Sequence, residues 1–225
     1  MSGIEYKLRW SGPWSWRDFD TVRLEISVGQ DYHEGAKLKT TMDWARGNFN
    51  RAVIILGDTI QGYNLSIVRS MDLHAAFDTA RGAGDEWLSR NKDAIRGVEV
   101  TRWDDWRNHA DYPANRAAVQ AMYENNDAFR THIDDTVEGF WWRRNASVAY
   151  DDRFKTISRD FLLEETAVFA SAYKELGGIS AYPGSFLETW QMFIDGHVEG
   201  APEGLKNAHW TRLQFRRRPL QAMVG

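Results

Sequence analysis

The stretch LEISVGQDYHEG, residues 24–35, decides the fold, because a buried apolar run ends within it and a helix follows. Leu24 and Ile26 belong to an apolar segment that predicts a strand over 21–28. Ser27 stands where this strand opens into a turn at Gly29, and residues 35–49 then have the apolar stripe of a helix. Strand, turn and helix in this order are typical of an α/β fold. The stretch also raises a chemical question, namely why a serine closes a buried strand.

The rest of the chain continues the alternation of strands and helices. RAVIILGD, residues 51–58, is a continuous apolar run, as expected of a strand covered on both faces. Further strands are predicted over 97–103 and 179–182. Helices are predicted over 63–80, 85–96, 113–140 (one or two), 150–176 with Gly177-Gly178 as its end, and within 183–197. We therefore predict an α/β fold, a doubly wound Rossmann-like parallel sheet with helices on both faces, as a single domain over 1–225.

Composition excludes several classes of protein. The 225 residues contain no cysteine, which excludes a disulfide framework and thiolate zinc sites. The six histidines are scattered without i,i+4 pairs, so we expect no metal. The first residues lack the apolar core of a signal peptide, and no apolar run approaches the ~20 residues that span a bilayer. We expect a cytoplasmic monomer without membrane contact.

Three predicted strands end in polar or reactive side chains. Ser27 follows the first strand, Asp58 the second and Tyr182 the last. Ligands of open α/β sheets bind beyond the carboxyl ends of the strands, so we expect these three side chains to meet at a pocket. The alternative is that strand ends simply tend to carry polar residues.

A carboxylate interrupts the apolar stripe of the predicted helix over 150–176. On a helical wheel, Glu165 falls about 40° from Phe161 among apolar residues, and Glu164 falls at the edge of the stripe. A carboxylate on a core-facing stripe is costly unless it has a partner or a task. Glu165 is therefore either paired with a buried arginine, for which Arg143 is a candidate, or tuned for proton transfer.

Several chemistries compete for Ser27. A Ser-His-Asp hydrolase needs G-x-S-x-G, and EISVG lacks the first glycine, while nothing in the sequence brings a histidine beside Ser27. No phosphate-binding GxxxxGK[ST] loop is present. YHEG (32–35) and KTISR (155–159) only faintly echo the ATP-binding signatures of class I aminoacyl-tRNA synthetases. We therefore expect neither ATP nor another cofactor.

Three motifs together resemble the cyclodipeptide synthases. They are ISVGQDYHEGAKL (26–38), FLLEE (161–165) and AYPG (181–184), and their order and separation make the match. The resemblance runs from about residue 21 to about residue 200. It implies the fold of the catalytic domain of tyrosyl- and tryptophanyl-tRNA synthetases, two aminoacyl-tRNAs as substrates and a diketopiperazine as product. The pair Tyr182-Pro183 is similar to the XYP branch of the family.

The resemblance also implies roles for individual residues. Ser27 matches the nucleophile that takes the first aminoacyl group, Glu165 the group that anchors the substrate amine and transfers protons, and Tyr182 the tyrosine of the Tyr-Pro pair. Arg143 fits a basic residue that lines the second substrate's pocket. The sequence departs from the family pattern at Phe161, where a tyrosine is usual, so that one amine-binding hydroxyl is missing or comes from another group.

Further residues are expected around the serine. A second departure is Glu25, where a glycine is common, and its position on the strand puts it on the face of Ser27. The backbone N–H groups of Val28 and Gly29 are expected to bind the acyl oxygen. Glu25 and Asp58 near one pocket would favour a cationic or hydrogen-bond-donating substrate side chain, unless Arg23 or Arg51 neutralises Glu25.

A tRNA substrate requires local cationic surface, because the net charge is −4. We expect Lys155 and Arg159, on the outward face of the helix over 150–176, to bind tRNA together with Arg143 or Arg144 at the margin, and Arg216 to Arg218 are the next candidates. Two other functions stay open: an adenylating transferase similar to class I synthetases, and a tRNA-binding module that kept the fold and lost the chemistry.

Overall fold

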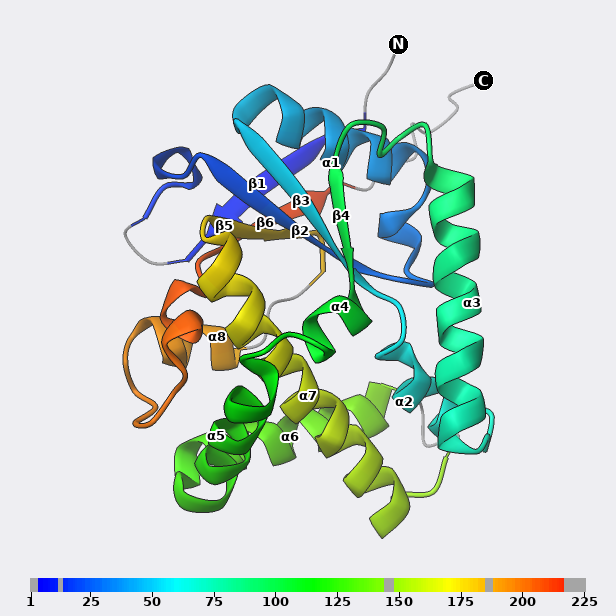
Figure 1. The fold of residues 1–225 in the computed structure, drawn as a ribbon, viewed down its shortest axis with the longest axis vertical. Helices are drawn as coiled ribbons and strands as arrows, with labels where there is room; N and C mark the ends of the chain where they lie inside the picture. The colour runs from blue at the N-terminus through cyan, green and yellow to red at the C-terminus, as the bar shows by residue number, and fades with distance from the viewer. Residues whose placement is uncertain (1–3, 12–13, 144–147, 185–187, 217–225) are drawn as a thin grey trace, which may run out of the picture.

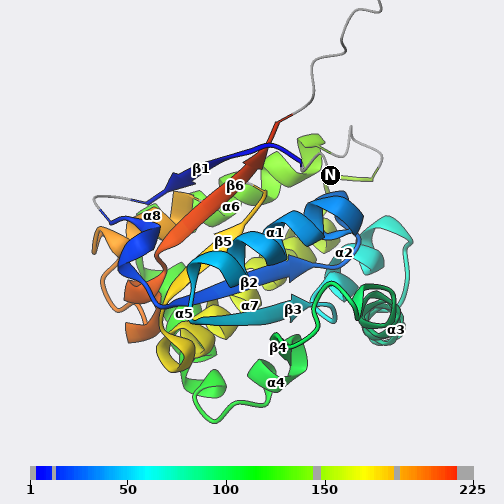
Figure 2. The ribbon, with the colours of Figure 1, turned by 90° about the horizontal axis from the view of Figure 1, so that it is seen from above.

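The computed structural model describes residues 4–11, 14–143, 148–184 and 188–216, and it contains one six-stranded sheet with helices on both faces (Figures 1 and 2). The strand order is β1-β6-β5-β2-β3-β4. Neighbours from β6 to β4 are parallel, and β1 pairs antiparallel with β6 at one edge. The strands are β1 (Tyr6–Trp10), β2 (Thr21–Ser27), β3 (Arg51–Gly57), β4 (Glu99–Arg102), β5 (Ile179–Tyr182) and β6 (Trp210–Phe215).

The helices divide between the two faces of the sheet. Against one face pack α1 (Gly35–Asn48) and α3 (Leu73–Asn91), and against the other pack the remaining helices around α7. These are α2 (Gln61–Val68), α4 (Trp103–Arg107), α5 (Tyr112–Asn125), α6 (Asp127–Arg143), α7 (Asp152–Leu176) and α8 (Glu188–Ile194). Short 3-10 turns are η1 (Trp16–Asp18), η2 (Asp31–His33) and η3 (Glu203–Asn207).

Strand alternation in β2 positions the polar residues that matter below. Val22, Leu24 and Ile26 belong to the apolar core on the side of α1 and α3. Successive side chains of a strand point to opposite faces, so Arg23, Glu25 and Ser27 point toward α7. One strand therefore presents three polar side chains in a row to the longest helix.

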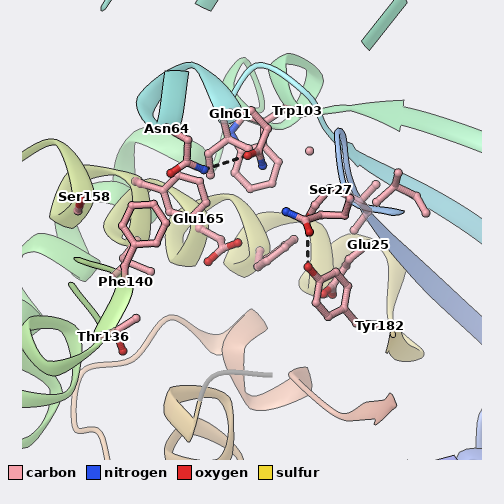
Figure 3. Close-up of a pocket in the computed structure, with 18 of the residues that line it drawn as sticks. Glu25, Ser27, Gln61, Asn64, Trp103, Thr136, Phe140, Ser158, Glu165 and Tyr182 are labelled. Carbon is pink, nitrogen blue, oxygen red and sulfur yellow. Dashed lines mark hydrogen bonds between the residues drawn. The ribbon is translucent and has the colours of Figure 1, made fainter. Parts of the chain in front are cut away.

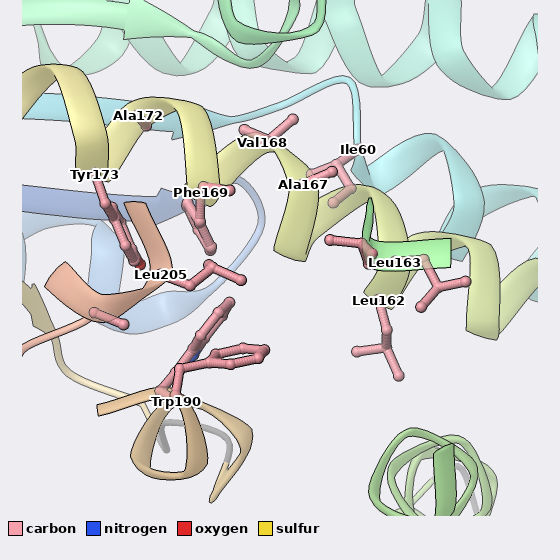
Figure 4. Close-up of a cluster of buried hydrophobic side chains, with 14 of the residues drawn as sticks. Ile60, Leu162, Leu163, Ala167, Val168, Phe169, Ala172, Tyr173, Trp190 and Leu205 are labelled. Carbon is pink, nitrogen blue, oxygen red and sulfur yellow. The ribbon is translucent and has the colours of Figure 1, made fainter. Parts of the chain in front are cut away.

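The 25 residues of α7 run along the sheet and form the centre of the larger core (Figure 4). Asp151 caps its first turn by accepting a hydrogen bond from Phe154 N–H. Gly177 ends it with a φ of +59°, a left-handed conformation that favours glycine. Toward its C-terminal end α7 is buried almost all round by the sheet, α8 and η3. Within the described ranges, no helix combines the length and the apolar character that crossing a bilayer requires.

The predicted α/β fold is confirmed, with corrections at the edges. The sequence prediction lacked β1 and β6, so it missed the antiparallel edge. It was also wrong to divide the chain into helices over 63–80 and 85–96, because the break falls between α2 and α3 and α3 continues through Gly82 and Gly84. Gly84 has a packing reason, since a Cβ there would lie 2.5 Å from Asp58 Oδ2. The close approach of α3 to β3 therefore needs a glycine inside the helix.

Candidate active site

A cavity of about 440 Å³ opens beyond the carboxyl ends of β2, β3 and β5, where α2, α6 and α7 cover the sheet (Figure 3). Apolar and aromatic side chains make about half of its wall, among them Ile55, Ile60, Phe140, Leu162, Phe169 and Trp190. Polar side chains that line it are Glu25, Ser27, Gln30, Tyr32, Gln61, Asn64, Thr136, Arg143, Ser158, Glu165 and Tyr182. This location is the one expected for a ligand site of an α/β sheet.

Ser27 is held at the cavity by a tight turn. Its carbonyl oxygen accepts a hydrogen bond from Gln30 N–H at 3.3 Å, and Gly29 has a φ of +90° between them. A positive φ at the third position of a turn favours glycine, which explains Gly29 directly. Gly29 is not among the residues that line the cavity. Its role as a donor to an acyl oxygen stays a prediction.

His33 lies beside Ser27, which the sequence did not predict. Its Nδ1 is 2.9 Å from the Ser27 backbone nitrogen and accepts that N–H, while Trp87 Nε1 donates to the His33 carbonyl oxygen at 3.0 Å. Burial lowers the pKa of His33 to about 4, so the ring is neutral at neutral pH. Because Nδ1 binds the backbone N–H, His33 orients the serine and is not arranged as a general base toward its hydroxyl.

Three hydroxyl groups form a short chain at the nucleophile. Ser27 Oγ lies 3.2 Å from Tyr182 OH (Figure 3), and Tyr182 OH lies 2.8 Å from Tyr32 OH. Burial is the main cause that raises the pKa of both tyrosines, which therefore keep their protons at neutral pH. Tyr182 OH can donate a hydrogen bond to Ser27 Oγ or accept one from it, depending on how the hydrogens of the three hydroxyl groups are oriented.

Glu165 extends from α7 into the middle of the cavity (Figure 3). Burial, and after it the negative charge of Glu25, raise the pKa of Glu165 to about 8. This carboxyl can therefore hold or release a proton near neutral pH. Arg143, the partner considered above, also lines the cavity but has an exposed side chain at the end of α6.

Glu25 lies on the face of Ser27, as its place on β2 implied, and it belongs to a buried network. Tyr173 OH donates to Glu25 Oε1 at 2.5 Å, and the Arg23 guanidinium lies 3.8 Å over the Tyr173 ring. Burial raises the pKa of Glu25, while hydrogen bonds from Ser180 and Tyr173 and the charge of Arg23 lower it. Arg51 is not its partner, because it pairs with Glu99 at 2.8 Å.

Two acidic residues differ from their sequence predictions. Asp58 does not line the cavity: its carboxylate is fully buried and pairs with Arg102 at 2.5 Å, so its assignment to substrate binding was wrong. Glu164 is not at the edge of the core but buried, where it accepts hydrogen bonds from Tyr63 OH and Trp103 Nε1, each at 2.9 Å. Both residues are held by structural partners far away in sequence.

The other predicted site residues have mixed locations. Phe161 lines the cavity and packs edge-on against Tyr63, whose hydroxyl donates a hydrogen bond to Glu164. Lys155 is exposed with its Nζ 4.6 Å over the Tyr150 ring, and Arg159 lies against Tyr123. Arg144 falls outside the described residues, as do Arg217 and Arg218.

The sequence did not predict the polar group on α2 and the start of α7. Asn64 Nδ2 donates to Gln61 Oε1 at 2.9 Å (Figure 3), which leaves an amide donor on Gln61 and an acceptor on Asn64 for the cavity. Ser158 is 4% exposed, and its hydroxyl has no hydrogen-bond partner in the structure. In the described part of the chain, no group of three or more His, Asp or Glu is arranged to hold a metal ion.

Comparisons with known proteins support the fold. No family model and no curated protein matches the sequence. A cyclodipeptide synthase (CDPS) from Fluoribacter dumoffii superposes with a TM-score of 0.78 and 24% identity, covering 95% of this chain and 100% of that one. The cyclodipeptide synthase from Bacillus thermoamylovorans superposes with a TM-score of 0.75 and 15% identity, covering 94% of this chain and 97% of that one. The cyclodipeptide synthase from Candidatus Glomeribacter gigasporarum bound to Phe-tRNAPhe superposes with a TM-score of 0.67 and 18% identity, covering 88% of this chain and 89% of that one. The chain therefore has the fold of solved cyclodipeptide synthases.

Proposed function

We propose that the chain is a cyclodipeptide synthase of the XYP type, which joins the aminoacyl groups of two aminoacyl-tRNAs. The observation that carries the proposal is the meeting of Ser27, Tyr182 and Glu165 in one cavity at the carboxyl end of the sheet. A hydroxyl nucleophile, a hydroxyl partner for it and a carboxyl that titrates near neutral pH are the groups that aminoacyl transfer needs. One structural neighbour is a cyclodipeptide synthase bound to Phe-tRNAPhe, which supports tRNA as the substrate carrier.

In the first step, Ser27 Oγ attacks the ester carbonyl of the first aminoacyl-tRNA. A new ester bond forms on Oγ, the bond to the terminal ribose oxygen breaks, and the serine proton ends on that ribose oxygen. Tyr182 OH, 3.2 Å from Oγ, is in position to relay this proton. The substrate ester is already activated, so the step needs no ATP.

In the second step, the amine of the second aminoacyl-tRNA attacks the acyl carbon on Ser27. An amide forms, the serine ester breaks, and a proton from the amine returns to Oγ. The remaining free amine then attacks the second ester, which releases the second tRNA and closes the diketopiperazine ring. Each attacking amine must lose a proton, and Glu165, with a pKa of about 8, matches the ~7.7–8.0 of an α-amino group.

The side-chain chemistry of the substrates has support from the cavity wall. The wall lacks a hydroxyl at Phe161, but Ser158 and the amides of Gln61 and Asn64 offer hydrogen bonds. A buried polar group left unpaired costs free energy, so an aminoacyl group with a hydrogen-bonding side chain gains from this set. Glu25 lines the same cavity, but its carboxyl is engaged by Tyr173 OH and lies near the charge of Arg23, so a preference for a cationic substrate side chain stays a prediction.

Bacterial expression followed by mass spectrometry of the medium tests the proposal. Cells that express the wild type should release diketopiperazines, and cells that express Ser27→Ala at equal protein level should not. The absence of any diketopiperazine from wild-type cells, and from purified protein given charged total tRNA, would reject the proposal. ATP-pyrophosphate exchange by the purified protein would instead identify an adenylating transferase, and tRNA binding without product would identify a binding module.

A further inference from the structure

The C-terminal end of α6 carries an exposed indole. Trp142 is 61% exposed, the highest value among the large hydrophobic side chains of the described ranges. Its Nε1 donates to Glu138 Oε1 at 3.2 Å, and its ring centroid lies 4.7 Å from that of Trp141. Both contacts hold the indole in place although most of its surface is exposed. A large aromatic side chain held in this way marks an interaction site rather than core filler.

A row of aromatic rings connects this indole with the cavity. Trp141 donates its Nε1 to the Val148 carbonyl oxygen at 2.8 Å and lies 5.1 Å from the Tyr150 ring. The ring centroids of Tyr150 and Phe154 lie 5.8 Å apart. Those of Phe154 and Phe140 lie 5.9 Å apart, and these two rings are stacked with an interplanar angle of 17°. Phe140 is part of the cavity wall (Figure 3). The exposed indole is thus the outer end of a packed support that begins at the cavity.

Cations lie along the same row. Arg143 directly follows Trp142, is exposed and lines the cavity. Lys155 Nζ lies 4.6 Å over the Tyr150 ring. Aromatic faces beside cations are the combination that binds single-stranded nucleic acid, through stacking of bases and contacts to phosphates. Glu138 offsets part of the positive charge, so stacking should contribute more here than charge.

We infer that Trp142 stacks on a base in the unpaired 3′ end of the tRNA substrate. The inference rests on the proposed function for its occupant: the reacting ester is on the last nucleotide, and that ester has to reach Ser27 through the cavity that Arg143 lines. The unpaired nucleotides before it then pass the end of α6. The indole stacks on one of these bases, and Arg143 and Lys155 contact the phosphates beside it.

The test measures the dissociation constants (Kd) of two RNA hairpins, one that copies an acceptor stem with its unpaired 3′ nucleotides and one that is blunt. Trp142→Ala should raise the Kd of the first hairpin roughly 5- to 150-fold, the range of a lost base–aromatic stack, and leave the second unchanged. Trp142→Phe should keep most of the affinity. The matched control is Trp10→Ala, which removes an indole that is 42% exposed on the edge strand β1.

Salt dependence separates stacking from charge. The slope of log Kd against log salt should stay the same in Trp142→Ala and fall in Arg143→Gln. The inference would be overturned if Trp142→Ala and Trp10→Ala bound the hairpin with the unpaired end with equal Kd. It would also be overturned if Trp142→Ala raised the Kd of both hairpins by the same factor. A dimer of the wild type that Trp142→Ala dissociates without changing the Kd would overturn it as well, because the indole would then contact a second copy of the chain.

The outcomes also separate this inference from the proposed function. If the wild type makes no diketopiperazine but its binding of the unpaired end depends on Trp142, the proposed function fails and the inference stands. If the wild type makes diketopiperazine and Trp142→Ala uses aminoacyl-tRNA with unchanged KM, the inference fails and the proposed function stands. If the wild type does not bind the hairpin with the unpaired end, the inference fails.

Discussion

The side-chain oxygens of Ser27 and Tyr182 lie 3.2 Å apart at the ends of two neighbouring parallel strands, although 155 residues separate them in the sequence. Tyr182 OH also contacts Tyr32 OH at 2.8 Å, so the nucleophile has one direct hydroxyl neighbour and one indirect neighbour. This order of contacts predicts an order of effects for substitutions that remove each hydroxyl.

Tyr182→Phe should lower the rate of diketopiperazine formation roughly 100-fold or more, because the group next to Oγ can no longer donate to it or relay its proton. Tyr32→Phe should have a smaller effect, since its hydroxyl acts only through Tyr182. Single-turnover kinetics with purified variants measure both rates, with circular dichroism as the control for folding. A larger loss in Tyr32→Phe than in Tyr182→Phe would contradict this reading of the hydroxyl chain.

Glu165→Gln should abolish most activity and change the pH dependence of stability. The pKa of Glu165 is about 8 in the fold against an ordinary 4.5, so between these values the folded state keeps a proton that the unfolded state loses. Wild-type stability should therefore fall, relative to Glu165→Gln, as pH rises from about 4.5 to about 8. Urea unfolding at several pH values measures this difference. A difference that does not vary with pH would mean that the carboxyl is not buried as described.

Glu164→Gln is the matched control, because it changes the neighbouring residue in the same way. Tyr63 OH and Trp103 Nε1 both donate to the Glu164 carboxylate, and an amide offers them one acceptor where the carboxylate offers two. The variant should lose stability, by about 1–3 kcal/mol, while the folded fraction keeps its reactivity. A Glu164→Gln variant with wild-type stability but with activity as low as that of Glu165→Gln would contradict this account.

His33 should act on the rate through the position of Ser27. His33→Asn keeps an acceptor for the Ser27 N–H and should stay active, whereas His33→Leu removes it and should lower kcat with little change in KM. The pKa of His33 is about 4 in the fold against an ordinary 6.5, so the unfolded state gains a proton first on acidification. Wild-type stability should fall from about pH 6.5 to about pH 4, and less so in both variants. An unchanged acid profile in the variants would remove His33 from this account.

Lys155 and Arg159 are predicted to contact the tRNA backbone from the outward face of α7. The double substitution to Ala should raise the Kd for tRNA and lower the slope of log Kd against log salt by about 1 for each lost phosphate contact. Binding measured between low and moderate salt gives this slope. If the slope does not change, this face is not the binding surface, and Arg216 is the next residue to test.

The parts of the fold that the sequence predicted have strong local signals. The continuous apolar run of β3, the Gly177-Gly178 end of α7 and the position of Glu165 on an apolar stripe are all readable within one turn or strand. In contrast, β1 and β6 pair across about 200 residues, and the mixed polar and apolar composition of the mostly exposed β1 carries little periodicity. Pairing between strands so far apart in the sequence cannot be read from local pattern alone.

The same distinction applies to the site. The three strand-end residues looked equivalent in the sequence, yet Asp58 is held by Arg102, 44 residues further on, and does not reach the cavity. His33 is only six residues from Ser27, but the 3-10 turn η2 that brings its ring to the serine N–H has no apolar periodicity. Partners that depend on tertiary contacts or on an irregular turn were therefore the ones that the sequence could not predict.

The most direct measurement of the central claim is the mass of the intact protein after brief mixing with aminoacyl-tRNA. The account predicts that the wild type gains the mass of one amino acid minus water, that peptide mapping assigns it to Ser27, and that adding the second aminoacyl-tRNA removes it as diketopiperazine appears. Ser27→Ala should gain no mass and make no product while still binding tRNA. Diketopiperazine formation by Ser27→Ala at the wild-type rate, or an acyl group on another residue, would contradict the account.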